Sequence, residues 1–144
     1  MRGRYLYLLM AAAAFPVQAA DRAQGDWVTG TGDAHVRVAA CPGAEQTLCG
    51  TIVWLAEPLN AEGKPKRDKN NPDPALQNRP IAGTQIISGM KPGAAGKWED
   101  GEIYDPSVGK KYSSTMKLGP HGELLVEGCF LLFCRQQTWH RVGG

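Results

Sequence analysis

The sequence contains few charged residues and no long stretch that favours a helix. Charged residues make up 21% of the 144 positions, whereas 18 Gly and 10 Pro interrupt the chain throughout. A long helical bundle or coiled coil is excluded, because such proteins are rich in Ala, Glu, Lys and Leu and poor in helix breakers. The hydrophobic share of 42% suffices for one packed domain and is too large for a disordered tail.

The apolar run near the N-terminus is too short to cross a membrane. It spans Tyr5–Phe15, about eleven residues, after Arg2 and Arg4, whereas a membrane-spanning helix needs roughly 20. Small residues follow at the positions that a signal peptidase reads, which predicts an export signal over residues 1–19. Cleavage after Ala19 fits better than cleavage one residue later. We expect a periplasmic or secreted protein without a transmembrane segment, with one domain over residues 20–144.

No excess of positive charge remains once the leader is removed. Of the 16 Lys and Arg residues, 14 remain and balance 14 Asp and Glu. Nucleic-acid-binding proteins usually carry a basic stripe. The local excess at Lys64–Lys69 is interrupted by Pro65 and Asp68, so we interpret it as a solvated loop and expect no nucleic-acid partner.

Four cysteines lie in the expected mature part, and an even number in an exported protein predicts disulfides. Three pairings exist. The local pairs Cys41 with Cys49 and Cys129 with Cys134 are favoured, because each brackets a short segment between two strand-like runs. A zinc site is the alternative, but most Cys-rich zinc sites use hooks of two intervening residues, whereas the spacings here are seven and four.

Apolar and polar residues alternate along the mature chain, and Gly, Pro, Asn and Asp break the pattern at short intervals. Alternation with this period predicts β-strands. About eight runs show it, namely residues 26–29, 35–40, 48–55, 85–89, 102–104, 112–118, 123–127 and 135–142. Antiparallel strands of this number close as a barrel or stack as a sandwich. We favour a small all-β antiparallel barrel, because closure leaves no exposed edge.

The stretch Ala56–Pro80 shows no apolar periodicity and contains five prolines. We expect one long ordered loop there, with a short helical turn within residues 71–78. Its closely spaced oxygen donors suggest a calcium site, but the spacing lacks the Gly and the final Glu of an EF-hand loop. A metal-free loop held by hydrogen bonds is favoured. The candidate loop and turn residues are Asp68, Asn71, Asp73 and Arg79, together with Asp105 and Lys110 of a second turn motif.

No catalytic motif is present in the sequence. Neither a Gly-x-Ser-x-Gly elbow nor a His-Glu-x-x-His pair occurs, and the three histidines, His35, His121 and His140, are expected at the surface. Evenly paired cysteines leave no free thiolate to act as a nucleophile. We therefore expect no enzymatic activity, no cofactor and no metal.

Two short features resemble lipocalins and their calycin relatives. Gly25-Asp26-Trp27 opens the first predicted strand, and Arg141 lies near the end of the last. The resemblance implies that Arg141 lies across the Trp27 indole, a cation–π contact that helps to close the barrel.

Longer motifs extend over nearly the whole mature chain, namely residues 25–27, Leu48–Leu55, the loop from Asp68 to Gly83, Trp98–Tyr112 and Gln137–Arg141. Together they resemble a bacterial exported family, domain of unknown function 2147. The resemblance implies a lipocalin-like fold and brings no established activity. The chain departs from many members around the last hairpin, where it has Cys129 and Cys134.

Inward-facing aromatic residues of such a barrel either fill the core or line a cavity. An eight-stranded barrel is wide enough for one small ligand, and aromatic residues with polar ends suit an amphiphilic one. The leading hypothesis is therefore binding of a small apolar or amphiphilic molecule; the oligomeric state stays open. The alternatives are a cell-envelope interaction module with a filled barrel and an enzyme that uses the loop carboxylates. The candidate ligand-binding residues are Trp54, Trp98, Tyr104, Tyr112, Ser114 and Met116.

Overall fold

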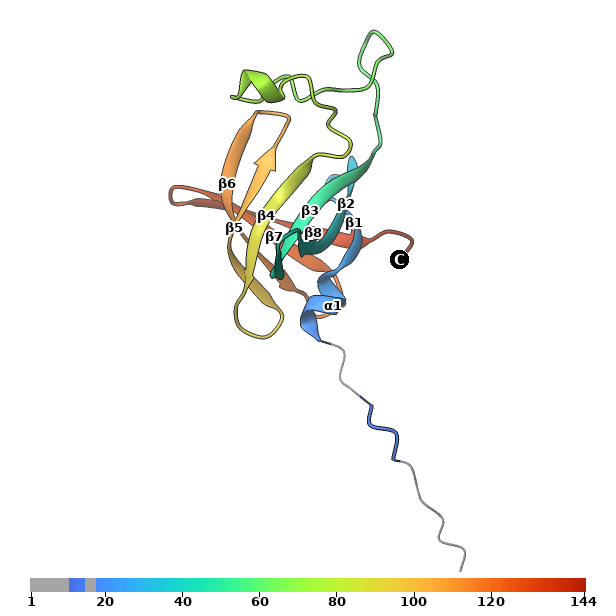
Figure 1. Ribbon diagram of the computed structural model, residues 1–144, viewed down its shortest axis with the longest axis vertical. Helices are drawn as coiled ribbons and strands as arrows, with labels where there is room; N and C mark the ends of the chain where they lie inside the picture. The colour runs from blue at the N-terminus through green and yellow to red at the C-terminus, as the bar shows by residue number, and fades with distance from the viewer. Residues whose placement is uncertain (1–10, 15–17) are drawn as a thin grey trace, which may run out of the picture.

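The computed structural model describes residues 11–14 and 18–144, so most of the predicted export signal, residues 1–10 and 15–17, lies outside the described residues. Eight antiparallel strands close into a barrel in chain order (Figure 1). This confirms the predicted fold. No helix in the described ranges is long and apolar enough to cross a bilayer. The elements are α1 (Ala19–Ala23), β1 (Gly25–Val28), β2 (Ala34–Cys41), β3 (Ala44–Leu55), the 3-10 helix η1 (Pro74–Leu76), β4 (Gln85–Pro92), β5 (Lys97–Asp105), β6 (Lys110–Leu118), β7 (Leu124–Phe130) and β8 (Phe133–Arg141).

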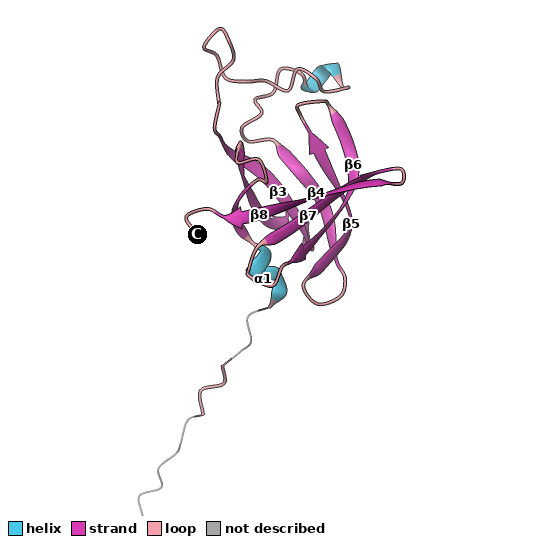
Figure 2. Ribbon diagram, turned by 180° about the vertical axis from the view of Figure 1, so that it is seen from behind, coloured by secondary structure: helices cyan, strands magenta, loops and turns pink. Residues whose placement is uncertain are grey.

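The barrel closes between its first and last strands. β1 pairs with β8 through Trp27 opposite Arg141 and Val28 opposite His140, and β1 also pairs with β2. Because the strands alternate in direction, the connections after β1, β3, β5 and β7 all lie at one end, which we call the open end. The helix α1 lies at the opposite end, which we call the closed end (Figure 2).

The closed end is packed with large apolar side chains. Six of them are at most 3% exposed: Trp27, Val38, Met90, Trp98, Met116 and Leu124. The helix α1 adds Ala23, whose carbonyl oxygen accepts a hydrogen bond of 2.8 Å from the Trp27 indole N–H. Burying one large apolar side chain contributes about 1.5–3 kcal/mol, so these side chains stabilise the closed end.

The expectation that Trp54 faces the barrel interior is wrong. Its side chain is 45% exposed and stacks on His35 outside the barrel, with ring centroids 4.2 Å apart. The cause is an irregularity in the pairing of β2 with β3: His35 pairs with Trp54, whereas Val36 pairs with Ile52. Val53 is thus an additional residue in β3, and a bulge of this kind reverses the alternation beyond it.

The long loop runs over residues 56–84 and covers part of the open end (Figures 1 and 2). The predicted helical turn within residues 71–78 is present as η1. Asp73 caps it, since its carboxylate accepts a hydrogen bond of 2.9 Å from the Ala75 amide.

Candidate functional site

A cavity of about 1780 Å³ occupies the open end of the barrel and continues under the long loop. Its inner wall carries apolar side chains from four strands, including Ile52, Ile86, Ile103 and Val126, and the indole of Trp139. Volumes of several hundred Å³ already accommodate drug-sized ligands. The open end of the barrel is therefore hollowed, while Ile52, Val126 and Trp139 of its wall are at most 3% exposed.

The predicted ligand-binding residues divide between the two ends of the barrel. Tyr104 and Tyr112 line the cavity. Trp98 and Met116 lie in the buried core and do not line the cavity. Ser114 is 3% exposed, and its hydroxyl donates a hydrogen bond of 2.6 Å to the Glu127 carbonyl. The predicted inward orientation of these last three residues agrees with the structure, but they lie outside the cavity lining.

The mouth of the cavity is polar on the side of the loop. Lys66, Arg67, Lys69 and Asn70 line it together with Asp33 of the β1–β2 turn. Lys66 forms an ion pair with Glu57 at 3.6 Å, and Arg67 donates a hydrogen bond to the Asn78 carbonyl. The cavity thus combines an apolar interior with a polar mouth.

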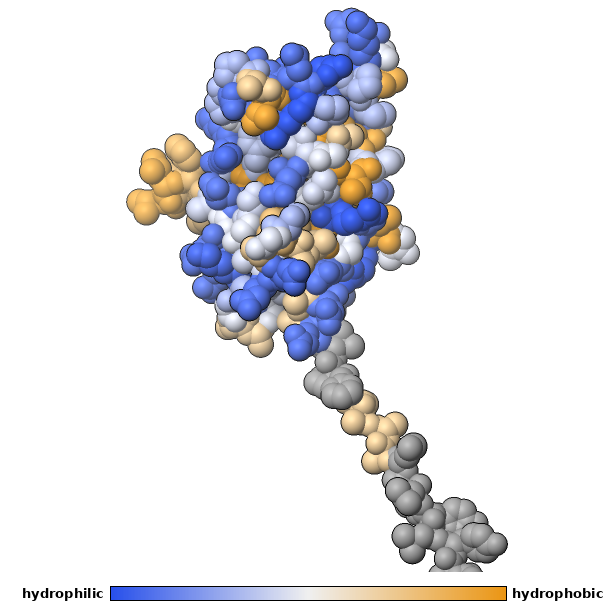
Figure 3. All heavy atoms as spheres, viewed as in Figure 1, coloured by the Kyte–Doolittle hydropathy of each residue, from blue (hydrophilic) through white to orange (hydrophobic). Residues whose placement is uncertain are grey.

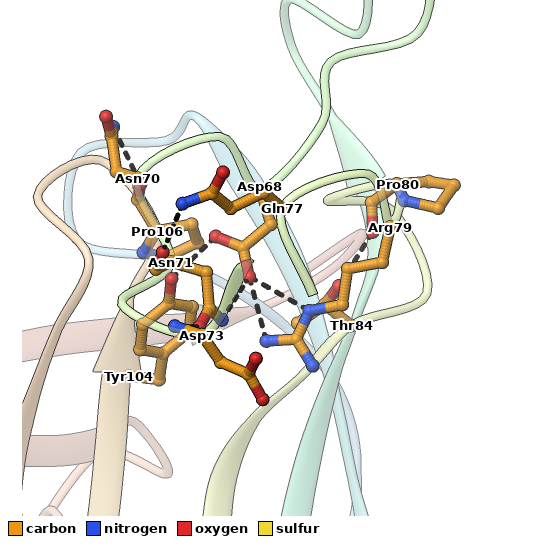
Figure 4. A network of polar contacts seen from close by, with 10 residues as sticks. All are labelled: Asp68, Asn70, Asn71, Asp73, Gln77, Arg79, Pro80, Thr84, Tyr104 and Pro106. Atoms are coloured by element: carbon orange, nitrogen blue, oxygen red, sulfur yellow. Dashed lines mark hydrogen bonds and ion pairs between the residues drawn. The ribbon is translucent and has the colours of Figure 1, made fainter. Parts of the chain in front are cut away.

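Asp68 is the centre of a polar network that attaches the loop to the barrel (Figure 4). Its carboxylate is fully buried and accepts a hydrogen bond of 2.6 Å from the Tyr104 hydroxyl on β5. It also accepts bonds of 2.8 Å from the Asn71 amide and 2.9 Å from the Arg79 guanidinium. Buried charges are tolerated when they are paired and hydrogen-bonded in this way.

The network shifts the acidity of its two ends in opposite directions. Burial raises the pKa of Asp68, but the hydrogen bonds from Tyr104, Asn71 and Arg79 outweigh it, so the pKa lies below its usual 3.8. Burial, followed by the hydrogen bond to the Asp68 carboxylate, raises the pKa of Tyr104 to about 12. The pair is thus an ionised carboxylate and a neutral phenol at neutral pH.

A second attachment of the loop reaches the β5–β6 turn. The Asn70 side-chain amide donates hydrogen bonds of 3.2 Å and 3.0 Å to the carbonyls of Pro106 and Ser107. Gly109 allows this approach, because a Cβ atom there would lie 1.8 Å from the Asn70 carbonyl oxygen and its φ is +67°. Asp105 shapes the same turn by accepting a 2.9 Å bond from the Ser107 amide, and Lys110 is exposed.

The oxygen donors that suggested a calcium site engage different partners. Asp68 binds Tyr104 and Arg79, and Asp73 caps η1. Asn70 binds the neighbouring turn, while the Asn71 side-chain oxygen accepts a 2.8 Å bond from the Asp73 amide. These contacts hold the loop in the hydrogen-bonded form that the sequence favoured.

Sequence reasoning missed most of the cavity wall. Ile86, Ile103 and Gln137 line the cavity, yet nothing in the alternation separates a residue beside an empty space from one in a filled core. It also missed Gln77, whose amide donates a 2.9 Å bond to the Asn71 carbonyl. Its place in a loop rich in Asn and Asp is the one signal that pointed to such bonds.

The two favoured cysteine pairs are both at disulfide distance. Cys41 and Cys49 join the arms of β2 and β3 at the closed end, with sulfur atoms 2.02 Å apart. Cys129 and Cys134 join β7 and β8 at the open end, at 2.01 Å. Disulfides fit an extracytoplasmic, oxidising compartment.

The closing contact between the first and last strands is present as expected. The Arg141 guanidinium lies 4.3 Å from the centre of the Trp27 ring. It also donates hydrogen bonds to the carbonyls of Gln24, at 2.8 Å, and Arg22.

A family model described as "Uncharacterized protein conserved in bacteria (DUF2147)" matches residues 25–141, from the first to the last strand. The chain belongs to the DUF2147 family. A solved structure, protein HP1028 from the human pathogen Helicobacter pylori, described as belonging to the lipocalin family, resembles this chain with a TM-score of 0.69. The identity is 20%, over 83% of this chain and 82% of that chain, and this likeness shows a lipocalin-like fold. No curated protein sequence matches.

Proposed function

We propose that this DUF2147 protein is an exported, non-enzymatic binding protein that holds a small apolar or amphiphilic molecule in the open half of its barrel. The observation that supports the proposal is the cavity of about 1780 Å³ with an apolar wall and a polar mouth. The two disulfides agree with a periplasmic or secreted location, and the N-terminal run of residues 1–19 would supply the export signal.

The alternative of an interaction module with a filled barrel accounts for the closed half alone. A barrel that serves only as a scaffold gains stability from continued packing, whereas here Tyr104, Tyr112 and Ile103 border an open space. The hollow half therefore favours a ligand over a scaffold.

Binding of a hydrophobic fluorescent probe tests the proposal. We expect one probe per protein, with a rise in fluorescence that saturates. Ile103→Trp should weaken binding about tenfold or more, equivalent to ~1.4 kcal/mol, because Ile103 borders the cavity and the larger ring would fill part of it.

Thr115→Trp is the matched control, because Thr115 is exposed on the outer face of the neighbouring strand β6. Its affinity should equal that of the wild type. Ser114→Phe is unsuitable for this purpose, since Ser114 is buried and overpacking there would cost about 1–3 kcal/mol. Absence of saturable binding by the folded wild type would contradict the proposal and favour the scaffold.

A further inference from the structure

The end of the β7–β8 hairpin exposes four consecutive large apolar side chains, Phe130–Phe133, which we call the apolar tip. Their exposed fractions are 55%, 83%, 96% and 81%. Figure 3 shows them as an orange projection, at the place where Figure 1 draws the end of this hairpin. Single exposed apolar residues are ordinary, but a contiguous apolar patch marks a site of interaction.

Neither packing nor turn chemistry accounts for the two leucines of the tip. Phe130 pairs with Phe133, so Leu131 and Leu132 form a two-residue turn, and Leu131 has a φ of +55°. Turns with a positive φ at the first central position favour Gly there. A bulky side chain that is strained and exposed at once points to a role outside the folded chain.

The shape of the tip favours a lipid surface over a protein surface. It is a narrow, convex projection of two strands, whose arms the Cys129–Cys134 disulfide joins directly below it. Acyl chains yield to such a projection, whereas a protein partner would need a matching groove. Phe130 also packs edge-on against Tyr112, with ring centroids 6.4 Å apart, and Tyr is a side chain that prefers the membrane interface.

Charges beside the tip complement an anionic lipid headgroup. Arg135 follows Cys134 directly, and the exposed Lys110 and Lys111 begin β6, next to Tyr112. The cations are accompanied by two carboxylates: Glu127 lies 3.6 Å from the Cys129 sulfur at the base of the tip, and Asp105 pairs with Lys110 in the β5–β6 ladder. Cations close to an anionic leaflet add to the binding that apolar insertion provides.

We propose that the apolar tip inserts into an anionic lipid surface and docks the cavity mouth there. Phe130, Phe133 and Arg135 belong both to the tip region and to the cavity lining. Docking would therefore place the opening against the bilayer, so that an apolar ligand passes between membrane and barrel with little contact with water. This last step rests on the proposed binding function; insertion of the tip does not.

Flotation of the purified, oxidised protein with vesicles tests the proposal. We expect the wild type to float with vesicles of phosphatidylglycerol and phosphatidylethanolamine and to float less with vesicles of phosphatidylcholine. The double variant Leu131→Gly, Leu132→Ser should bind about 100-fold more weakly, because two large apolar side chains leave the lipid. The same change supplies a preferred turn, so the variant should unfold at the same or a higher urea concentration.

Val142→Ser is the matched control, because Val142 is 41% exposed and follows β8 at the closed end. It should float like the wild type. Equal flotation by the tip variant, or no flotation by the wild type, overturns the proposal. So does a concentration-dependent dimer that the tip variant abolishes without any vesicle binding, which would identify a second copy as the occupant. Probe binding in the absence of vesicles reports separately on the cavity, so failure of one proposal is distinguishable from failure of the other.

Discussion

The two ends of this barrel use the same eight strands in different ways. At the closed end, Trp27, Met90 and Leu124 are completely buried beneath α1. At the open end, the strands surround a cavity of about 1780 Å³, and a long loop is held above it by hydrogen bonds to Asp68 and Asn70. We therefore expect the closed end to contribute more to stability than the open end, whose interior is hollowed.

Truncation of one large apolar side chain at each end tests this division most strongly. Trp27→Ala should lower the free energy of unfolding by about 3–5 kcal/mol, since it leaves a cavity in a packed core. Ile103→Ala should lower it by only about 1 kcal/mol, because Ile103 already borders an open space and loses few contacts. Urea denaturation measures both. Equal losses would show that the two halves are packed alike.

The buried carboxylate of the open end should give the next largest effect. Asp68→Ala leaves the Tyr104 hydroxyl and the Asn71 amide without their acceptor, at a cost of about 3 kcal/mol. Loop cleavage in limited proteolysis should increase with it. Asp73→Ala is the control, because it removes one exposed cap and costs about 0.5–1 kcal/mol. If both variants lose the same amount, the network does not anchor the loop.

Acid should affect the same network. The pKa of Asp68 in the folded protein lies below its usual 3.8, so its contribution is complete above that value and is lost as the pH falls through the lower, folded pKa. The stability difference between neutral pH and a pH below 3.8 should therefore be smaller in Asp68→Asn. Part of the acid dependence that persists in Asp68→Asn should come from Asp26 and Asp33. Hydrogen bonds from Arg37 and Thr31 lower the pKa values of these two carboxyl groups. An unchanged acid dependence would contradict this role.

The stability of the protein at high pH should depend on Tyr104, the donor of the hydrogen bond to Asp68. The pKa of Tyr104 is raised to about 12 from 10.0, so the folded state holds the proton more tightly than the unfolded state. The contribution of this group is complete below pH 10 and is lost as the pH rises through about 12, by about 3 kcal/mol at most. Tyr104→Phe should remove that part of the fall. Tyr112→Phe serves as the control, and equal curves for both variants would refute the assignment.

The sequence predicted the barrel better than it predicted the cavity. Alternation locates residues such as Val36 and Met116 inside, because a period of two depends on the backbone alone. It failed at Trp54, where one additional residue in β3 reverses the faces. Alternation also predicted only residues 102–104 of β5, which spans Lys97–Asp105. The reason is that Asp100, with a φ of +57°, interrupts the alternation before Gly101.

The hollow half could not be predicted from alternation for a different reason. Ile103 and Ile87 are the same residue type on neighbouring strands, yet one borders the cavity and the other is fully buried. The difference depends on what lies across the barrel interior from each residue, which is a property of the whole fold. In contrast, the contact between Arg141 and Trp27 could be predicted, because it belongs to a short motif whose geometry the fold preserves.

That closing contact gives the smallest predicted effect and the most specific one. Arg141→Ala removes the cation–π contact with Trp27 and the bonds to the carbonyls of Gln24 and Arg22, and should cost about 1–2 kcal/mol. This position of the Arg141 side chain requires a glycine at residue 25. The φ of Gly25 is +124°, and a Cβ atom there would lie 2.5 Å from an Arg141 nitrogen.

Arg37→Ala is the control for loss of a positive charge, since Arg37 pairs with the Asp26 carboxylate and its side chain is 60% exposed. It should shift the urea midpoint much less than Arg141→Ala, because exposed ion pairs contribute little to stability. Urea midpoints distinguish the two, and Arg141→Lys should fall between them because it keeps the charge and loses the planar group. An unchanged midpoint for Arg141→Ala would mean that backbone pairing of β1 with β8 closes the barrel unaided.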